Sequence, residues 1–155
     1  MHVRKARPGD AAAIQALYKE LVPGDANIAV DPRRIVELDD DAYNHLFVVE
    51  AAGGVCGTAF LTLCLDPMYG FQPYGVVENV IIADAARRNG AGRMLLAAVE
   101  HLARSAHCTK LMLLSTATRR EAHAFFMAVG FDGDRKRGFV KYINRSNRRG
   151  PPSAT

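Results

Sequence analysis

The chain has 155 residues, 49% of them hydrophobic, and a formal net charge of +4. This length and apolar content predict one domain with a core of its own. No apolar run approaches the ~20 residues that a membrane-spanning helix needs, and the first residues lack the apolar segment of a secretory signal. The three cysteines have neither an even count nor C-x-x-C spacing, so they support neither a disulfide framework nor a zinc site. We therefore expect a soluble, reduced, cytoplasmic protein.

The positive charge is concentrated in two places, the turn that contains Arg87, Arg88 and Arg93 and the tail beyond residue 143. Proteins that bind nucleic acid usually carry a basic stripe with aromatic residues among the cations. A cluster at a single turn fits a small anionic ligand at least as well. We expect no nucleic-acid partner and no membrane partner.

The first half of the chain predicts a strand, two helices and a hairpin. Residues 2–6 alternate weakly as in a strand, and Asp10 is a plausible N-cap for a helix that continues to Leu21. Asp31-Pro32 starts a second helix that runs to about Asp40, because proline is favoured at the first helical position. Two β-rich runs, 46–51 and 55–65, flank Gly53-Gly54 and predict a hairpin.

The second half alternates strands and helices. The expected elements are a strand over 76–83, a helix over 90–105, a fully buried strand over 110–115, a helix over 119–128 and a last strand over 138–143. The order β-α-α-β-β-β-α-β-α-β predicts an α/β fold of the α+β kind, a mixed sheet flanked by helices. We expect a single domain over 1–143 and a disordered tail over 144–155.

The turn between the strand over 76–82 and the following helix is the most informative part of the chain. It reads Arg87-Arg88-Asn89-Gly90-Ala91-Gly92. Glycines let the backbone approach a ligand, and the first amides of a helix are unpaired donors that favour negative charge. A Walker loop is excluded because Arg93-Met94 follow Gly92 where Lys-Ser/Thr is needed, and Leu95 stands where a dinucleotide fingerprint needs its third glycine.

The pattern Arg/Gln-x-x-Gly-x-Gly after a Glu-Asn-Val-Ile-Ile strand resembles the acetyl-CoA pyrophosphate loop of GNAT-type N-acetyltransferases. A second GNAT signature is similar to the helix Arg119 to Phe131, in which Ala122, Phe125, Gly130 and Phe131 match. The likeness covers nearly everything from Val3 to Ile143. Within the family, the chain resembles small-molecule amine acetyltransferases, with features of the aminoalkylphosphonate type.

The resemblance implies a GNAT-like fold in which the central strand splays from its parallel neighbour. The freed main chain of that strand then pairs with the pantetheine arm of acetyl-CoA, the co-substrate. The residues expected to bind it are Val80, Ile81, Ile82, Arg87, Arg88, Asn89, Gly90, Ala91, Gly92, Arg93 and Phe126. Glu78 is the first choice for the general base, because a glutamate in this strand serves as base in some relatives. The alternative is a structural glutamate paired with an arginine, and Tyr69, Tyr74 and His45 are weaker candidates for the base.

One residue departs from the family pattern. Many relatives carry, at the position of Phe126, a tyrosine that protonates the leaving thiolate, and phenylalanine cannot do so. The resemblance implies acetyl transfer to a primary amine of a small molecule. The alternatives are acetylation of a protein N-terminus or lysine, or a catalytically weak acyl-CoA-binding protein. The five histidines show no metal-binding spacing, and His123 is expected to be solvated or to cap the core. The sequence is compatible with a homodimer.

Overall fold

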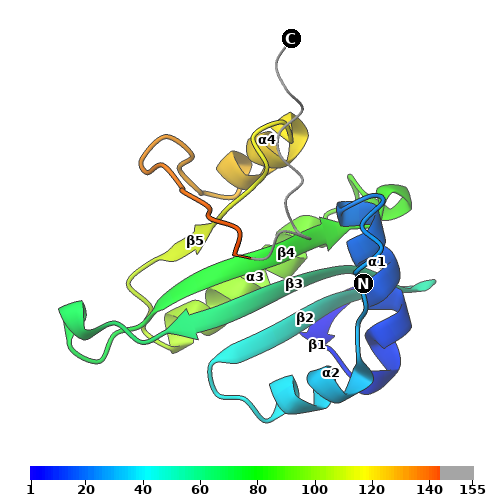
Figure 1. The fold of residues 1–155 in the computed structure, drawn as a ribbon, viewed down its shortest axis with the longest axis horizontal. Coiled ribbons are helices and arrows are strands. Elements are labelled where there is room, and N and C mark those ends of the chain that lie inside the picture. The colour runs from blue at the N-terminus through cyan, green and yellow to red at the C-terminus, as the bar shows by residue number, and fades with distance from the viewer. Residues whose placement is uncertain (144–155) are drawn as a thin grey trace.

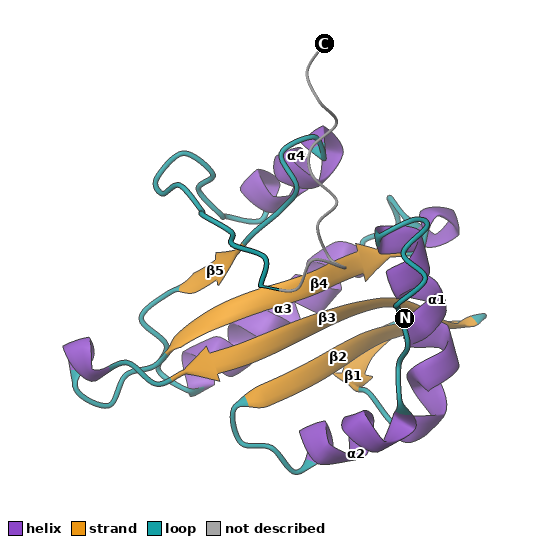
Figure 2. Ribbon diagram, in the orientation of Figure 1, coloured by secondary structure: helices purple, strands orange, loops and turns teal. Residues whose placement is uncertain are grey.

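The computed structural model describes residues 1–143. One five-stranded sheet has the order β1-β2-β3-β4-β5, and only β4 and β5 run parallel to each other. The strands are β1 (His2–Lys5), β2 (Asn44–Ala51), β3 (Gly54–Cys64), β4 (Tyr74–Ile82) and β5 (Leu111–Leu113). The helices are α1 (Ala11–Leu21), α2 (Pro32–Asp39), α3 (Ala91–Ser105) and α4 (Arg120–Ala128), with short 3-10 turns η1 (Pro8–Asp10), η2 (Pro67–Tyr69) and η3 (Asp84–Ala86). The predicted mixed α/β fold is confirmed, and its order holds through α4 (Figures 1 and 2).

Helices cover both faces of the sheet, and the strand alternation separates two cores. Leu46 and Val48 of β2 pack with Ile14 of α1 and Ile35 of α2. Phe47, between them, joins the other core with the buried residues Leu95 and Val99 of α3 and Phe126 of α4. Figure 1 shows α3 behind β3 and β4, and α4 beyond the end of β5. In the described residues, no helix is long and apolar enough to cross a membrane.

The two predicted helix starts differ in their chemistry. Asp31 caps α2 as expected, since its carboxylate accepts a hydrogen bond from the Arg33 N–H at 2.9 Å. Asp10 precedes α1 as predicted but makes no side-chain cap bond to it. Its carboxylate instead accepts from the Arg7 N–H at 2.7 Å and from the Arg4 guanidinium at 2.7 and 3.0 Å. The stronger charge-assisted partner thus takes the oxygens that a cap would use.

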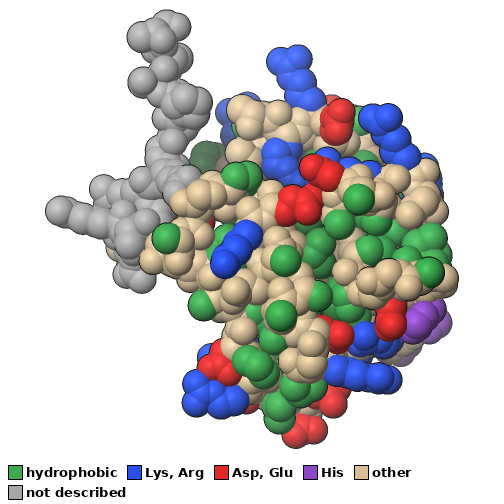
Figure 3. Space-filling view, turned by 90° about the vertical axis from the view of Figure 1, so that its right-hand side faces the viewer, with side chains coloured by type: hydrophobic (Ala, Val, Ile, Leu, Met, Phe, Trp, Pro, Cys, Tyr) green, Lys and Arg blue, Asp and Glu red, His purple; other side chains and the backbone are tan. Residues whose placement is uncertain are grey.

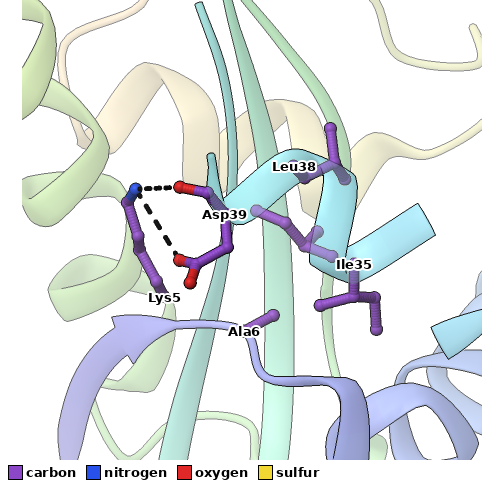
Figure 4. Close-up of a pocket in the computed structure, with 6 residues that line it drawn as sticks. Lys5, Ala6, Ile35, Leu38 and Asp39 are labelled. Atoms are coloured by element: carbon purple, nitrogen blue, oxygen red, sulfur yellow. Dashed lines mark hydrogen bonds and ion pairs between the residues drawn. The ribbon is translucent and has the colours of Figure 1, made fainter. Parts of the chain in front are cut away.

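A small hollow marks the place where α2 docks on β1 and β2. In Figure 4, Lys5 reaches across it to the Asp39 main-chain oxygen at 3.3 Å and to the Asp39 carboxylate at 3.9 Å, and Ala6, Ile35 and Leu38 lie beside this pair. Its volume is ≈ 10 Å³, which leaves room for about one water molecule. This hollow is a packing feature and too small to be a ligand site.

Two strand predictions at the C-terminal end need correction. Residues 138–143 form no strand, and their apolar side chains are exposed, by 88% for Phe139 and 81% for Ile143. The segment passes beside Leu114, beyond the end of β5, where no ladder among the described residues continues. β5 itself is half-buried and not fully buried, because it is the edge strand of the described sheet. The predicted disordered tail, 144–155, lies outside the described residues.

Candidate active site

The predicted splay between the two parallel strands is present. β5 pairs with β4 only where Leu111, Met112 and Leu113 meet Gly75, Val76 and Val77. From Glu78 to Ile82, the side of β4 that faces β5 has no strand partner among residues 1–143. The main chain that was expected to receive the pantetheine arm is therefore free of a neighbouring strand.

A β-bulge lies where the splay begins, and sequence reasoning missed it. Phe60 pairs with Glu78 while Thr58 pairs with Ile81, so β4 contains one extra residue at this point. Asn79 adopts the left-handed conformation, with φ 54°, which asparagine tolerates better than most residues. Glu78 shares a face with Phe60, which packs with the α1/α2 core, whereas Val80 packs against the α3 core. The bulge thus places Glu78 and Val80 on opposite faces of the sheet.

An open groove runs from the freed part of β4 to α4, with a volume of ≈ 1120 Å³. It contains most of the residues expected to bind the cofactor. Those that line it are Val80, Ile81, Ile82, Arg87, Arg88, Gly90, Gly92, Arg93 and Phe126. Asn89 and Ala91 do not line it: Ala91 is buried, and the Asn89 side chain turns back and accepts the Ala91 N–H at 3.1 Å.

The first turn of α3 presents main-chain donors to this groove. Gly90 precedes the helix in the left-handed conformation, with φ 90°, where glycine is the favoured residue. The N–H groups of Gly92 and Arg93 have no hydrogen-bond partner within residues 1–143. Unpaired amides at a helix N-terminus attract an anion. This geometry fits the phosphate-binding role that the sequence predicted for the turn.

The three arginines of the turn differ in how many hydrogen bonds and ion pairs their guanidinium groups make. Arg87 donates to the Ile82 main-chain oxygen at 3.2 Å and pairs with the Asp84 carboxylate at 2.5 Å. Arg93 reaches the Ala128 main-chain oxygen at 3.4 Å. Arg88 lines the groove without an ion pair or side-chain hydrogen bond among the described residues, at φ 62°. Arg88 is therefore the guanidinium of this turn that is most available to a phosphate.

The opposite wall of the groove comes from the start of α4, which sequence reasoning did not assign to the site. Thr118, Arg119, Arg120 and Glu121 line it together with Phe125. Neither Arg119 nor Arg120 has an ion pair in the described part of the chain. A signal was present in the sequence, since the pair Arg119-Arg120 stands at the start of one helix and Arg87-Arg88 shortly before another. Both walls of the groove thus carry arginines that have no ion pair among the described residues.

Gly92 is required by packing as well as by ligand approach. A Cβ atom at this position would lie 2.9 Å from Phe125 Cζ and 3.6 Å from Ile82 Cγ1. The first turn of α3 therefore lies against the ring of Phe125 on α4. A large side chain at Gly92 would change this packing before it reached a ligand.

Glu78 is exposed, and its side chain makes no hydrogen bond or ion pair within residues 1–143. The alternative of an arginine-paired structural glutamate therefore finds no support there. The carboxylate lies outside the groove lining, on the α1/α2 face of β4 at the bulge. A base in this position would act on an acceptor that approaches from the face opposite α3.

The weaker candidates for the base do not gather at the splay. Tyr69 is half exposed in η2, and the neighbouring Cys64 raises the pKa of Tyr74, over whose ring Lys110 Nζ lies at 5.1 Å. His45 is buried opposite Leu61, on the α3 side of the sheet. His123 is half-buried, and its Nε2 lies 3.0 Å from the Thr116 main-chain oxygen, so it links α4 to the segment after β5.

Phe126 belongs to the core and to the groove at once. It is buried and packs edge-on against Phe131, with ring centroids 6.1 Å apart. Its ring has no proton to give, so the residue contributes shape and apolar surface. Among the described residues, no group of three His, Cys, Asp or Glu side chains is placed to hold a metal ion.

Comparison with known proteins connects this geometry to a family. The sequence model of the acetyltransferase (GNAT) family matches residues 12–131. The chain is 35% identical over 134 residues to an aminoglycoside N(6')-acetyltransferase type 1 from Stenotrophomonas maltophilia, which covers 84% of this chain and 85% of that protein.

Solved structures share the fold. A protein from Agrobacterium tumefaciens str. C58 superposes with a TM-score of 0.81 at 26% identity, over 92% of this chain and all of the other. An aminoglycoside N-acetyltransferase solved with CoA gives 0.74 at 20% identity, over 92% and 93% of the two chains. The chain therefore belongs to the GNAT family of acetyltransferases and is an N-acetyltransferase.

Proposed function

We propose that this protein transfers the acetyl group of acetyl-CoA to a primary amine of a small polyamine acceptor, of the aminoglycoside kind. One observation carries the proposal. A single groove joins the freed main chain of β4 to the open amides of α3 and to the guanidinium groups of Arg88, Arg119 and Arg120, which have no ion pair within residues 1–143. An amide-rich arm that ends in phosphates matches these two kinds of surface.

The cofactor would lie with its phosphates at the first turn of α3 and its pantetheine arm along Val80 to Ile82. Arg88 and the N–H groups of Gly92 and Arg93 would hold the pyrophosphate. Phe125 and Phe126 supply apolar surface on the other side of the arm. The thioester would then reach the bulge at Asn79, where β4 parts from β5.

In the reaction, the amine nitrogen attacks the thioester carbonyl carbon, the C–S bond breaks and CoA leaves as the thiolate. The amine must be neutral to attack, although a free alkylamine has a pKa near ~10. Glu78 is the proposed base, directly or through a water molecule, because its exposed carboxylate lies at the bulge and has no competing partner in the described part of the chain. With no hydroxyl at Phe126, solvent would protonate the thiolate, a fair leaving group with a thiol pKa near ~8.5.

The acceptor class rests on the relatives. The relative at 35% identity is named for acetylation of the 6' amine of aminoglycosides, and a polycationic acceptor suits an exposed carboxylate at the bulge. The resemblance to aminoalkylphosphonate enzymes stays a prediction. A catalytically weak acyl-CoA-binding protein is the second candidate, and the phenylalanine at position 126 is the observation that favours it.

The remaining partner predictions are part of the proposal. Figure 3, from the side of α1 and α2, shows Lys and Arg interspersed with Asp and Glu, so this face carries no basic stripe, and we keep the expectation of no nucleic-acid partner. The exposed apolar side chains of Phe139, Val140, Tyr142 and Ile143 favour a homodimer, since such patches often mark interfaces. Light scattering at several protein concentrations tests the dimer. The use of acetyl-CoA implies a cytoplasmic enzyme, which cell fractionation tests.

An acceptor panel tests the proposed function. Release of the CoA thiol is followed with an aminoglycoside that carries a 6' amine, a matched aminoglycoside with a 6' hydroxyl, and peptides with a free N-terminus or lysine. We expect thiol release and an acetylated product with the 6' amine alone. Acetylation of the peptides with a comparable kcat/KM would mean that the acceptor is a protein and not a small molecule. Binding of acetyl-CoA without turnover on any amine would favour the weak binding protein.

A further inference from the structure

The phosphate-binding turn is fastened to α1, an element 64 residues away in sequence. Oε1 of Glu20, in the last turn of α1, accepts the Asp84 N–H at 2.8 Å. The same oxygen lies 3.8 Å from the Arg87 guanidinium. Arg87 in turn holds the Ile82 main-chain oxygen at 3.2 Å and the Asp84 carboxylate at 2.5 Å. Glu20, Asp84 and Arg87 therefore form one cluster that joins α1, the end of β4 and η3.

This cluster replaces a local cap. Ala83 stands at the N-cap position of η3 and has no side-chain oxygen to offer, so the first amide of the turn depends on Glu20. Glu20 is only one-third exposed, and Arg87 less than half exposed. An open N–H at this position would be met by water, and the start of the turn would lose its fixed attachment to the body of the protein.

The cluster also changes the role of Arg87. Two carboxylates face its guanidinium, and a third bond goes to a main-chain oxygen. Binding a phosphate directly would require Arg87 to give up these partners or to share its charge with them. Arg88, by contrast, lines the same groove with no such partner in residues 1–143. Arg88 is thus the residue whose charge can contact a phosphate directly, and Arg87 holds the turn in place through Asp84 and the Ile82 main-chain oxygen.

We propose that Glu20 is a positioning residue for acetyl-CoA. Through Asp84 and Arg87, it holds the turn over 83–90 so that the open amides of α3 face the groove. This inference rests on the proposed function and deepens its cofactor site. Within residues 1–143, Glu20 has no hydrogen bond or ion pair with a groove residue other than Asp84 and Arg87, so its effect should reach the phosphates of the cofactor and leave the acceptor amine unaffected.

The test is a double-mutant cycle on the Kd of acetyl-CoA with Glu20→Ala, Arg87→Ala and the double variant. Each single change should weaken binding by roughly three- to tenfold, as for a partly exposed charged hydrogen bond. The double variant should lose little more than the larger single loss, because both residues act through one cluster. Glu20→Gln keeps an oxygen for the Asp84 N–H and should restore part of the affinity.

Two controls separate positioning from general stability. Glu100→Ala removes a surface carboxylate whose one ion-pair partner within residues 1–143 is Arg104 on α3, and it should leave the Kd unchanged. S-acetylpantetheine has the thioester arm without the pyrophosphate, so its KM and the KM of the amine should be the same in the wild type and in Glu20→Ala. Melting temperatures of all variants establish that each is folded under the assay conditions.

The outcomes are distinct. Additive losses of affinity would show that Arg87 binds phosphate by itself and would overturn the inference. An equal rise in KM for acetyl-CoA and for S-acetylpantetheine would also overturn it. If the wild type binds acetyl-CoA and Glu20→Ala binds it equally well, only the inference fails. If the wild type does not bind acetyl-CoA, the proposed function fails and the inference falls with it.

Discussion

Gly57 of β3 lies opposite Ile82 of β4, the strand expected to bind the cofactor, and its replacement by alanine tests how closely the two strands pack. A Cβ atom at Gly57 would lie 2.3 Å from Ile82 Cδ1, 2.8 Å from Val49 Cγ1 and 2.9 Å from the Ile81 main-chain oxygen. The Ile82 Cδ1 methyl ends a flexible side chain and can rotate away, but Val49 is fully buried and the Ile81 main-chain oxygen moves only if β4 moves. Overpacking of this kind costs about 1–3 kcal/mol.

A loss of that size should lower the melting temperature by about 2–12 °C in a chain of this length. Because the displaced atoms belong to Ile81 and Ile82, the KM for acetyl-CoA should rise together with the loss of stability. Gly53→Ala is the matched control. Gly53 lies in the β2–β3 turn with nothing within 4 Å of the added Cβ, and its φ is outside the left-handed range. Its replacement should be neutral or slightly stabilising.

The assay is thermal unfolding with and without acetyl-CoA, together with the KM of the cofactor. If Gly57→Ala unfolds within a degree or so of Gly53→Ala, well inside the shift expected above, the strand is not packed as described. If stability falls and the cofactor KM is unchanged, the freed part of β4 does not hold the pantetheine arm.

Three further predictions concern the chemistry of the site and the core. Glu78→Gln should lower kcat by about 10²–10⁴-fold and remove the acid limb of the kcat profile against pH, with acetyl-CoA binding unchanged; a kcat within about threefold of the wild type would exclude Glu78 as the base. Phe126→Tyr should leave acetyl-CoA affinity intact and raise kcat if the thiolate lacks a proton donor, whereas a total loss of turnover would mean that the ring packs against the acceptor. Burial, and next the charge of Lys5, lower the pKa of His45, whose ring nitrogens make no hydrogen bond of good geometry within residues 1–143. Below about pH 6.5 the unfolded state therefore binds a proton that the folded state does not. The contribution of His45 to the free energy of unfolding should be constant above about pH 6.5 and fall as the pH drops toward the folded-state pKa. Unfolding free energies of the wild type and His45→Leu between pH 8 and 5 check this, and parallel curves would contradict it.

The sequence predicted the elements whose signals are local. The Gly53-Gly54 turn, the proline after Asp31 and the stripe of Leu95 and Val99 each act within a few residues, and each led to the element that the structure contains. The phosphate turn was recognisable for the same reason, since glycines and arginines at fixed spacing are a local pattern. Residues 138–143 show the limit of this reasoning, because their strand-like pattern finds no partner edge beside β5.

What the sequence did not predict depends on pairing across the chain. The bulge at Asn79 exists only in the register between β3 and β4, and it reverses the face that simple alternation assigns to Val80 relative to Glu78. The second wall of the groove, with Arg119 and Arg120, becomes part of the site only when α4 packs beside α3. The bond from Glu20 to Asp84 spans 64 residues, so no local pattern could indicate it.

The central claim is that the groove between β4 and α4 binds acetyl-CoA through the turn before α3. Titration calorimetry of acetyl-CoA into the wild type, Arg88→Glu and His107→Glu tests it most directly. Arg88 and His107 both adopt left-handed backbone conformations, with φ 62° and 56°, so the two variants match in strain and only the first places a carboxylate in the groove. We predict one site in the wild type, an affinity lower by at least about tenfold in Arg88→Glu, and no change in His107→Glu. An absence of binding in the wild type, or equal affinity in all three proteins, would contradict the account.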